Sequence, residues 1–308
     1  MMKEFDFIEI ASNIFRKSGK RKEEVILGAG EDDCAVIRLS NRYSKYLVLT
    51  TDSLHEKTDF PEQMLPFEMG HMALAVNLSD LAGSGARPEY FLYTISLRDG
   101  IDENFFRQIL SGIKSLADRY DVEVVGGDVD FGDELYISGF AAGFTERFVP
   151  QSGAKPGDRI WITGITGKAQ LALEVLLSGK ERSEVPFLKS LLTPEPRIEE
   201  SIKASSYANA MTDISDSLAI SLNLISRKSG VKIEIFEELL DLSELTNFVE
   251  YDKALELFIY GGGDFELVYT AQEGEGIEIG RVKEGEGVKL KRKSGESTEI
   301  EFRGYSHF

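Results

Sequence analysis

The stretch MGHMALAVNLSDLAGSGARP, residues 69–88, places an asparagine and an aspartate inside an otherwise apolar segment. Its spacing predicts a long helix over residues 66–83, followed by a turn of small residues. Asn77 and Asp80 lie three residues apart and therefore share one face of that helix. Burying them without partners costs about 2 kcal/mol or more. We predict a metal or phosphate contact for this face; a salt bridge to a distant lysine or arginine is the alternative.

Four further acidic patches border predicted strands or turns. They read GEDDCAV at residues 30–36, TTDSL at 50–54, GGDVDFG at 126–132 and MTDISDSL at 211–218. Thr50, Thr51 and Asp52 supply oxygen atoms at what is predicted to be a strand end, where α/β proteins commonly bind ligands. Each patch alone also fits an acidic turn or a helix cap. Together with Asp80, the central carboxylates are Asp32, Asp33, Asp52, Asp128, Asp213 and Asp216.

Carboxylates that are partly buried repel one another and must be neutralised. The patches contain few lysines or arginines, so divalent cations with oxygen ligands are the natural counter-charge. Several Mg²⁺ ions in one site typically hold a polyphosphate. We therefore predict a Mg²⁺-dependent ATP enzyme without a Walker-type loop. The segment GITGK, residues 164–168, lacks the full phosphate-loop pattern, whereas GGGDFEL, residues 261–267, suggests a backbone close to a ligand.

The order of predicted elements indicates an α/β protein of two domains. Strands are expected over residues 34–39, 46–52, 90–98, 122–128 and 134–144, and helices over 4–18, 66–83 and 102–119. The turn-rich segment QSGAKPGDRI, residues 151–160, follows the last of these strands. We therefore place the boundary so that residues 1–148 form an ATP- and metal-binding domain and residues 149–308 complete the substrate site. The chain length of 308 residues suits two domains.

Composition excludes several classes of function. The net charge of −18 argues against a nucleic-acid binder, which needs a basic surface. No apolar run approaches the roughly 20 residues that span a bilayer, and the N-terminus lacks a signal-peptide layout, so a cytoplasmic location is expected. The single cysteine, Cys34, is interpreted as a small buried residue and not a nucleophile. Three histidines without ligand spacing make a zinc site improbable.

Seven segments carry a resemblance to a known family: GEDDCAV, TTDSL, ALAVNLSDLAGSGARP, GGDVD, QSGAKPGDRIWITG, MTDISDSL and GGGDFELVYT. In order and spacing they are similar to the thiamine-monophosphate kinases, within the superfamily of aminoimidazole-ribonucleotide synthetase and selenophosphate synthetase. The resemblance covers nearly the whole chain. It implies a two-domain α/β protein whose N-terminal domains pair through their strands in a homodimer. It also implies phosphorylation of thiamine monophosphate by ATP and Mg²⁺, through direct transfer without a covalent or general-base residue.

The resemblance also implies roles for individual residues. The metal-binding positions it implies are Asp33, Thr50, Thr51, Asp52, Asp80, Asp128, Asp213 and Asp216. The ATP-binding positions are Gly127, Asp128, Gln151 and Ser215, and the substrate-binding positions are Asp59, Gly263 and Tyr305.

Three positions depart from the family pattern. Asp59 stands where a histidine is usual, Gln151 stands where an arginine is usual, and Gly263 stands where a substrate-contacting glutamate is usual. The metal set is intact, so ATP and Mg²⁺ chemistry is the firmer expectation. Two alternatives stay open: a related ATP-dependent enzyme acting on another small phosphorylated substrate, and a non-catalytic nucleotide-binding protein.

Overall fold

The first sheet is built from six strands, β1–β6. The computed structural model describes residues 22–28, 31–39 and 46–305. The strands are β1 (Val25–Leu27), β2 (Ala35–Arg38), β3 (Tyr46–His55), β4 (Arg87–Leu97), β5 (Glu123–Phe131) and β6 (Tyr136–Thr145), in the order β1-β2-β3-β6-β4-β5. Only the pairing of β4 with β5 is parallel. The sheet is therefore mixed, with β5 as an edge strand.

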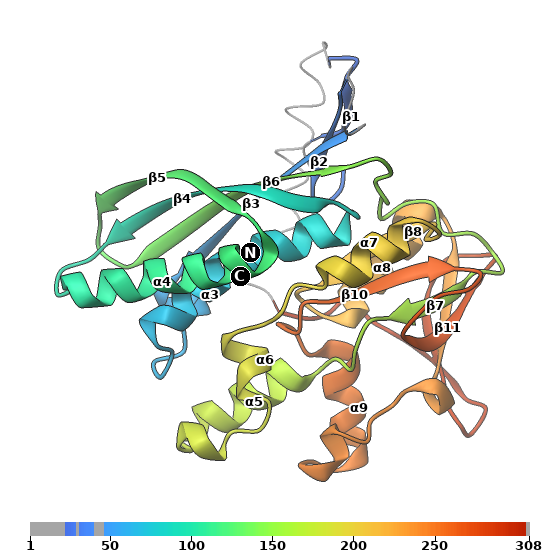
Figure 1. Ribbon diagram of the computed structural model, residues 1–308. Coiled ribbons are helices and arrows are strands. Elements are labelled where there is room, and N and C mark those ends of the chain that lie inside the picture. The colour runs from blue at the N-terminus through green and yellow to red at the C-terminus, as the bar shows by residue number, and fades with distance from the viewer. Residues whose placement is uncertain (1–21, 29–30, 40–45, 306–308) are drawn as a thin grey trace.

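Helices α3 (Pro66–Gly83) and α4 (Glu103–Tyr120) cover one face of this sheet (Figure 1). The short helix α2 (Glu56–Asp59) follows β3 directly. Helix α3 is buried over most of its circumference, because it packs against the sheet, against α4 and against the second half of the chain. Gly70 and Gly112 allow the two helices to cross closely, since a Cβ at either would lie 1.9 Å from a carbonyl oxygen of the other helix.

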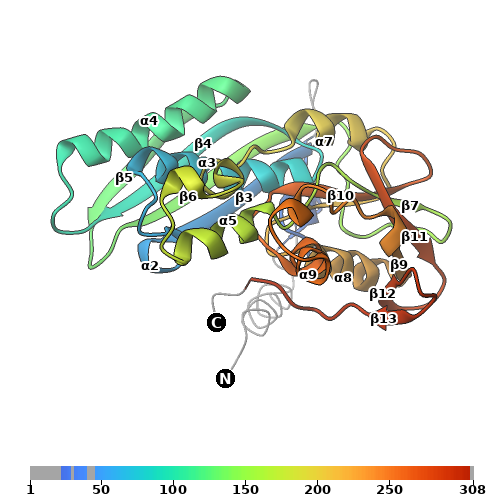
Figure 2. The ribbon, with the colours of Figure 1, turned by 90° about the horizontal axis from the view of Figure 1, so that it is seen from below.

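The second sheet contains seven strands. They are β7 (Arg159–Ile162), β8 (Ala210–Ile214), β9 (Lys232–Phe236), β10 (Glu266–Ala271), β11 (Ile277–Lys283), β12 (Gly287–Lys291) and β13 (Ser297–Glu299), in the order β13-β12-β9-β11-β7-β10-β8. Figure 2 shows β9, β12 and β13 on the side away from the first sheet. The edge strand β8 contacts α3, so the two sheets meet through this helix.

Helices of the second half surround its sheet. The α-helices are α5 (Lys168–Leu177), α6 (Leu188–Leu192), α7 (Ile198–Ser205), α8 (Leu218–Ser229) and α9 (Tyr251–Tyr260), and the 3-10 helices are η1 (Arg182–Glu184), η2 (Glu237–Leu239) and η3 (Leu245–Asn247). Helix α8 begins with a cap in which the Ser217 hydroxyl accepts from Ile220 N at 3.0 Å. It ends at Gly230, which adopts a left-handed conformation with φ 65°.

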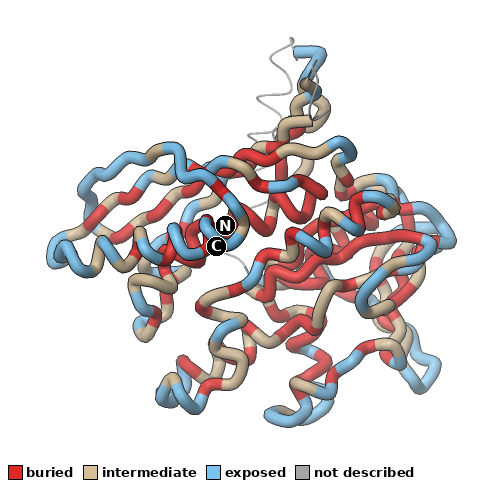
Figure 3. The backbone as a smooth tube through the Cα atoms, viewed as in Figure 1, coloured by how far each residue is buried: buried red, intermediate tan, exposed pale blue. Residues whose placement is uncertain are grey.

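One apolar core runs from the first half of the chain into the second. It includes Leu74, Leu78 and Phe91 as well as Met211 and Leu267 (Figure 3). The two sheets use strands on either side of residue 148, yet they share this core, so the division into domains 1–148 and 149–308 stays a prediction. No helix in the part of the chain that the structure describes is long and apolar enough to cross a membrane.

Most predicted elements are confirmed, and the mixed α/β class with them. Helix α3 has the predicted bounds, and Cys34 is buried as predicted. The helix predicted for residues 4–18 lies outside the described residues. Two details are wrong. The Gly126–Gly127 pair does not form a turn, because β5 continues through it to Phe131. The Thr50–Asp52 segment is not at a strand end, because β3 continues to His55.

Candidate active site

Three elements bring carboxylates together at the junction of the two sheets. Asp52 lies on the face of β3 that packs against α3, Asp80 lies in the last turn of α3, and Asp213 lies on β8. Thr50 points to the same face and its hydroxyl donates to Asp80 Oδ2 at 2.5 Å. The hydroxyl of Ser79 donates to Asp213 Oδ2 at 2.6 Å. Residues distant in sequence thus form one acidic centre.

The carboxylates at this centre interact electrostatically. Burial raises the pKa of Asp80 well above its usual value, and the charges of Asp52, Asp213 and Asp33 raise it further. Burial is also the main reason why the pKa of Asp213 rises to about 8, with further contributions from Asp33, Asp52 and Asp216. Each group therefore destabilises the charged form of its neighbours. Asp33 and Asp52 thus lie within electrostatic range of both Asp80 and Asp213, and Asp216 lies within range of Asp213.

The first acidic patch joins this centre through hydrogen bonds to the second half of the chain. The hydroxyl of Thr212 donates to Asp33 Oδ2 at 2.7 Å, and Gln151 Nε2 donates to the same oxygen. The backbone N–H of Gln151 donates to Asp32 Oδ2 at 2.9 Å. Burial and the charge of Asp33 raise the pKa of Asp32 to about 7, while Lys228 acts in the opposite direction. Gln151 therefore holds both aspartates of the patch.

The donor set fits a hard divalent cation. It consists of carboxylates and a threonine hydroxyl, the oxygen ligands that Mg²⁺ prefers. Asn77 Oδ1, one turn before Asp80, is buried and has no hydrogen-bond donor within the described part of the chain. In residues 22–28, 31–39 and 46–305, no three His, Cys, Asp or Glu side chains already form a group arranged to hold a metal.

The predicted substrate positions lie on segments that contact one another. The backbone N–H of Gly263 donates to the Ser215 carbonyl at 2.6 Å. The backbone N–H of Tyr305 donates to the Asp216 carbonyl at 3.1 Å, and its hydroxyl lies 3.3 Å from Asp59 Oδ1. The C-terminal segment therefore spans from the Ser215–Asp216 loop in the second half to α2 in the first half. Asp59 and Tyr305 come together, with the tyrosine 40% exposed.

Three predicted residues lie apart from the carboxylate cluster. Side chains alternate along a strand, so Thr51 points to the face of the first sheet opposite Thr50, where its hydroxyl donates to the Gly139 carbonyl at 2.7 Å. Asp128 is exposed and pairs in register with Thr94 on that same opposite face. The expectation that Asp128 is a shielded carboxylate is wrong. Gly127 lies beside the Tyr93 ring, where a Cβ would approach the ring to 2.6 Å.

The GITGK segment does not offer a free phosphate-binding loop. The backbone N–H groups of Gly167 and Ala169 donate to the buried carboxylate of Asp264, at 2.5 and 2.9 Å. Lys168 pairs with Glu244 at 2.9 Å. The donors at the start of α5 are thus used internally. This agrees with the incomplete sequence pattern of the segment.

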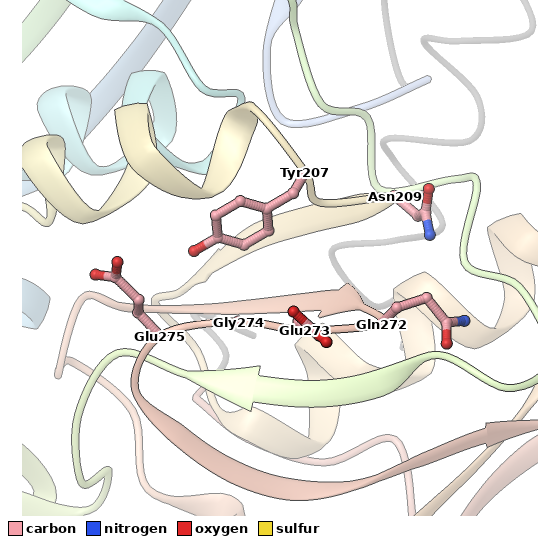
Figure 4. Close-up of a pocket in the computed structure, with 6 residues that line it drawn as sticks. All are labelled: Tyr207, Asn209, Gln272, Glu273, Gly274 and Glu275. Atoms are coloured by element: carbon pink, nitrogen blue, oxygen red, sulfur yellow. The ribbon is translucent and has the colours of Figure 1, made fainter.

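A surface cavity of about 630 Å³ lies elsewhere, between the β10–β11 turn and the end of α7. Figure 4 shows the Tyr207 ring above the turn that contains Gly274 and Glu275. Asn209, Gln272 and Glu273 complete the lining, so none of the predicted site residues contributes to it. The cavity and the acidic centre are therefore separate features.

Sequence reasoning missed three residues that contact the acidic centre. Ser79 directly precedes Asp80 in the helix quoted above, so its position next to a candidate ligand could have identified it. Thr212 precedes Asp213 in the same way. Lys228 gave no signal, because it sits in the last turn of α8 and reaches Gln151 only in the folded chain.

Comparisons with known proteins agree with this arrangement. Residues 31–145 match the family model described as AIR synthase related protein, N-terminal domain. The first half of the chain therefore contains a domain similar to that class. A thiamine-monophosphate kinase of Archaeoglobus fulgidus is 51% identical over 308 residues, which is 100% of this chain and 98% of the relative. One of Aquifex aeolicus is 37% identical, covering 94% of this chain and 95% of the relative. The chain belongs to the thiamine-monophosphate kinase family.

A solved structure gives the same result. The structure described as AaThiL complexed with AMPPCP and TMP matches with a TM-score of 0.87 and 32% identity, covering 99% of this chain and 97% of that chain. The mixed α/β architecture is thus that of the family, over almost the whole length of both proteins.

Proposed function

We propose that the chain transfers the γ-phosphoryl group of ATP to the phosphate of thiamine monophosphate, giving ADP and thiamine diphosphate. The observation that carries this proposal is the convergence of Asp33, Asp52, Asp80, Asp213 and Asp216 between the two sheets. The family supports the choice of substrates, because the related structure is complexed with AMPPCP and TMP. Carboxylates that repel one another at one junction cost stability unless a cation neutralises them, which supports a metal-binding role.

Magnesium ions would be held by Asp33, Thr50, Asp52, Asp80, Asp213 and Asp216. When bound, Mg²⁺ would neutralise the negative charge that the two phosphates share. The residues around these ligands fix their orientation: Thr50 holds Asp80, Ser79 holds Asp213, and Thr212 with Gln151 holds Asp33. Ligands held in advance lose little conformational freedom when the cation binds.

No described residue at the centre is needed as a nucleophile or strong base. The acceptor is a phosphate oxygen, which is already an anion, so the main obstacle is repulsion between donor and acceptor. Cys34 is buried, and burial together with Asp80 raises the pKa of its thiol well above the usual value, so it stays protonated. We therefore propose direct in-line transfer, without a phosphorylated enzyme. Ser215, half-buried in the loop after β8, is proposed as a nucleotide contact.

Asp59 and Tyr305 are proposed to recognise the thiamine part of the acceptor. The thiazolium ring of thiamine is cationic, and a carboxylate beside an aromatic ring is a favourable partner for such a cation. The 3.3 Å approach of the Tyr305 hydroxyl to Asp59 Oδ1 places both groups side by side. This pair explains how an aspartate at position 59 is compatible with a thiamine substrate. Gly263 leaves space where a larger side chain would stand, which keeps a different small phosphate ester as the second candidate acceptor.

A homodimer is proposed through the uncovered face of the first sheet. Leu92 and Phe140 are paired in register on adjacent strands, and they are 39% exposed on the face opposite α3. Tyr90, on the same face, is 41% exposed. Contiguous exposed apolar surface of this kind is characteristic of an interface. Pairing of two such faces would also bring Thr51 and Asp128 into a subunit junction.

The function is tested by measuring ADP and thiamine diphosphate after mixing the protein with ATP, Mg²⁺ and thiamine monophosphate. We expect thiamine diphosphate with the wild-type protein and its loss in Asp80→Asn and Asp213→Asn. Binding of Mg-ATP without formation of thiamine diphosphate would shift the proposal to another phosphate ester as acceptor. Activity retained in both variants would reject the assigned metal ligands.

A further inference from the structure

Gln151 occupies an unusual position for an amide side chain. It lies in the segment between β6 and β7, and its side chain is completely buried. Three segments that are far apart in sequence surround it: the loop containing Asp33, strand β8 with Thr212, and the end of α8 with Lys228. Direct contact between ATP and Gln151 would require these hydrogen bonds to be exchanged. A role through its neighbours is therefore more consistent with its burial.

The orientation of the amide is set by the chemistry of its partners. Gln151 Nε2 donates to Asp33 Oδ2 and, at 3.0 Å, to Thr212 Oγ1. The amide oxygen accepts from Lys228 Nζ. A lysine ammonium only donates and a carboxylate only accepts, so the opposite amide orientation would lose both contacts. Lys228 therefore decides which end of the amide faces Asp33.

Lys228 is itself anchored. Its ammonium also donates to the carbonyl of Glu31 at 2.8 Å, so it spans from α8 to the loop of the first acidic patch. Its charge also lowers the pKa of Asp32, against the larger effects of burial and of Asp33. The cation thus contacts both the backbone of the patch and the amide that holds the patch.

We infer that Lys228 and Gln151 form a positioning relay that aims the Asp33 carboxylate at bound Mg-ATP. The inference rests on the proposed function. Both donors to Asp33, Gln151 Nε2 and Thr212 Oγ1, reach the same oxygen, Oδ2. The charge of Asp33 acts on both Asp80 and Asp213, so its carboxylate lies within electrostatic range of the acidic centre. Lys228 fixes Gln151, Gln151 fixes Oδ2, and the remaining oxygen is presented in one direction.

One charged side chain could both supply positive charge near Asp33 and hold its carboxylate. The relay divides these two tasks between Lys228 and Gln151. The positive charge stays at Lys228, beyond the amide, and the neutral amide touches the carboxylate. Asp33 is thereby held without a direct ion pair, which would compete with a metal for the same oxygen atoms. Lys228 and Gln151 are positioning residues in this proposal, and for Gln151 this replaces the direct ATP contact that the family resemblance implies.

The test measures binding of Mg²⁺ with the non-hydrolysable analogue AMPPCP by calorimetry, so that it does not depend on turnover. We expect Lys228→Met and Gln151→Leu each to weaken binding about tenfold, because each removes a hydrogen bond that involves a charged group. Lys228→Arg keeps both the charge and the donor, and we expect it to bind within about threefold of wild type. The double variant Lys228→Met with Gln151→Leu should be no weaker than either single variant, because both break one relay.

Lys114→Met is the matched control, because Lys114 forms an exposed ion pair with Asp118 on α4, away from the acidic patch. Thermal unfolding of each variant without Mg²⁺ separates loss of folding from loss of positioning. Unchanged or tighter binding in Lys228→Met, or fully additive losses in the double variant, would overturn the relay. If the wild-type protein binds Mg-AMPPCP but forms no thiamine diphosphate, the proposed reaction fails while the relay stands or falls on the binding data.

Discussion

Ser79 on α3 donates a hydrogen bond to Asp213 on β8, with 2.6 Å between Ser79 Oγ and Asp213 Oδ2. The two residues are 134 positions apart in sequence, and both are buried. A donor directed at a buried carboxylate stabilises its charged form, which opposes the effect of burial on the pKa of Asp213. The bond therefore joins the two halves of the chain and favours the charged form of Asp213, which the proposed cation site requires.

Ser79→Ala tests this role. We expect kcat/KM to fall about tenfold or more, since a hydrogen bond to a charged group is worth about 1.5–3 kcal/mol. The fold should survive, because the variant leaves the surrounding apolar contacts in place. Steady-state kinetics at saturating and limiting Mg²⁺ provide the measurement. Ser111→Ala is the control, because that hydroxyl bonds only to the Arg107 carbonyl in the preceding turn of an exposed helix surface. Equal kcat/KM in both variants would remove Ser79 from the site.

For the metal-free protein, the acidic centre predicts that the free energy of unfolding falls as the pH rises. Burial and neighbouring carboxylates raise the pKa of Asp213 to about 8, from a usual value of 3.8. A carboxyl with a raised pKa binds its proton more tightly in the folded state. Its stabilisation is therefore complete below the unfolded value and is lost as the pH rises through the folded value. Asp80 acts in the same direction.

We therefore expect the metal-free protein to unfold at a temperature lower by about 5 °C or more near pH 8.5 than near pH 6. Mg²⁺ should remove most of this difference, because it replaces the protons that neutralise the cluster. Differential scanning calorimetry with and without EDTA gives the comparison. Asp213→Asn should flatten the pH dependence. A metal-free protein that is more stable near pH 8.5 would contradict the assignment of buried, coupled acids.

The sequence was sufficient to predict the helix over residues 66–83 and the meeting of Asp80 with Asp52 and Asp213. Those predictions depended on local patterns, such as apolar spacing and the energetic cost of buried polar groups. They were wrong where a strand continued past a glycine pair. Asp128 was expected at the end of a strand, but Val129–Phe131 extend β5 and leave it exposed.

Two other features could not be read from the chain. Side chains alternate along β3, so Thr50 and Thr51 point to opposite faces of the sheet. This separation can be recognised only when the length of the strand is known. Lys228 reaches Gln151 across 77 positions, through the packing of α8 against β8. Tertiary contacts of this kind depend on how whole elements pack, and the local sequence around Lys228 resembles an ordinary helix end.

Tyr305 and Asp59 predict a selective effect on the acceptor. Tyr305→Ala removes the ring and its contact with Asp59, so we expect the KM for thiamine monophosphate to rise about tenfold. Tyr305→Phe keeps the ring and removes the hydroxyl, which lies 3.3 Å from Asp59 Oδ1 and 3.5 Å from the Thr58 carbonyl oxygen, so we expect about a threefold rise. The KM for ATP is the internal control and should stay within about twofold. Equal changes in both KM values would indicate a general disturbance of the C-terminal segment.

The uncovered face of the first sheet predicts the oligomeric state. Leu92→Glu and Phe140→Glu place charges on the face opposite α3, where burial in an interface would be costly. We expect the wild-type protein to sediment as a dimer and both variants to sediment as monomers. Leu177→Glu is the control, because Leu177 is 69% exposed at the end of α5 in the other half of the chain. Sedimentation velocity distinguishes the species, and a monomeric wild type would reject the interface.

Asp264 predicts a contribution to stability that is independent of Mg²⁺. Its buried carboxylate accepts the backbone N–H groups of Gly167 and Ala169, at the start of α5. Asp264→Ala leaves these two donors buried without partners, which we expect to cost about 2–4 kcal/mol of unfolding free energy. Burial raises the pKa of Asp264 to about 7, and it is not part of the cation-binding set, so Mg²⁺ should not restore the loss.

Urea unfolding with and without Mg²⁺ measures both quantities. Asp241→Ala serves as the matched control, because Asp241 is exposed and its hydrogen bonds go to Ser243 in its own loop, with the N–H of Ser243 at 3.0 Å from Oδ1. Its removal should cost about 1 kcal/mol or less. If Mg²⁺ rescued Asp264→Ala, the carboxylate would belong to the metal centre, and the loop at the start of α5 would then be a phosphate-binding element after all. Loss of stability both with and without Mg²⁺ would instead show that Asp264 satisfies the two backbone donors of this loop, in the place that a phosphate would take in a phosphate-binding loop.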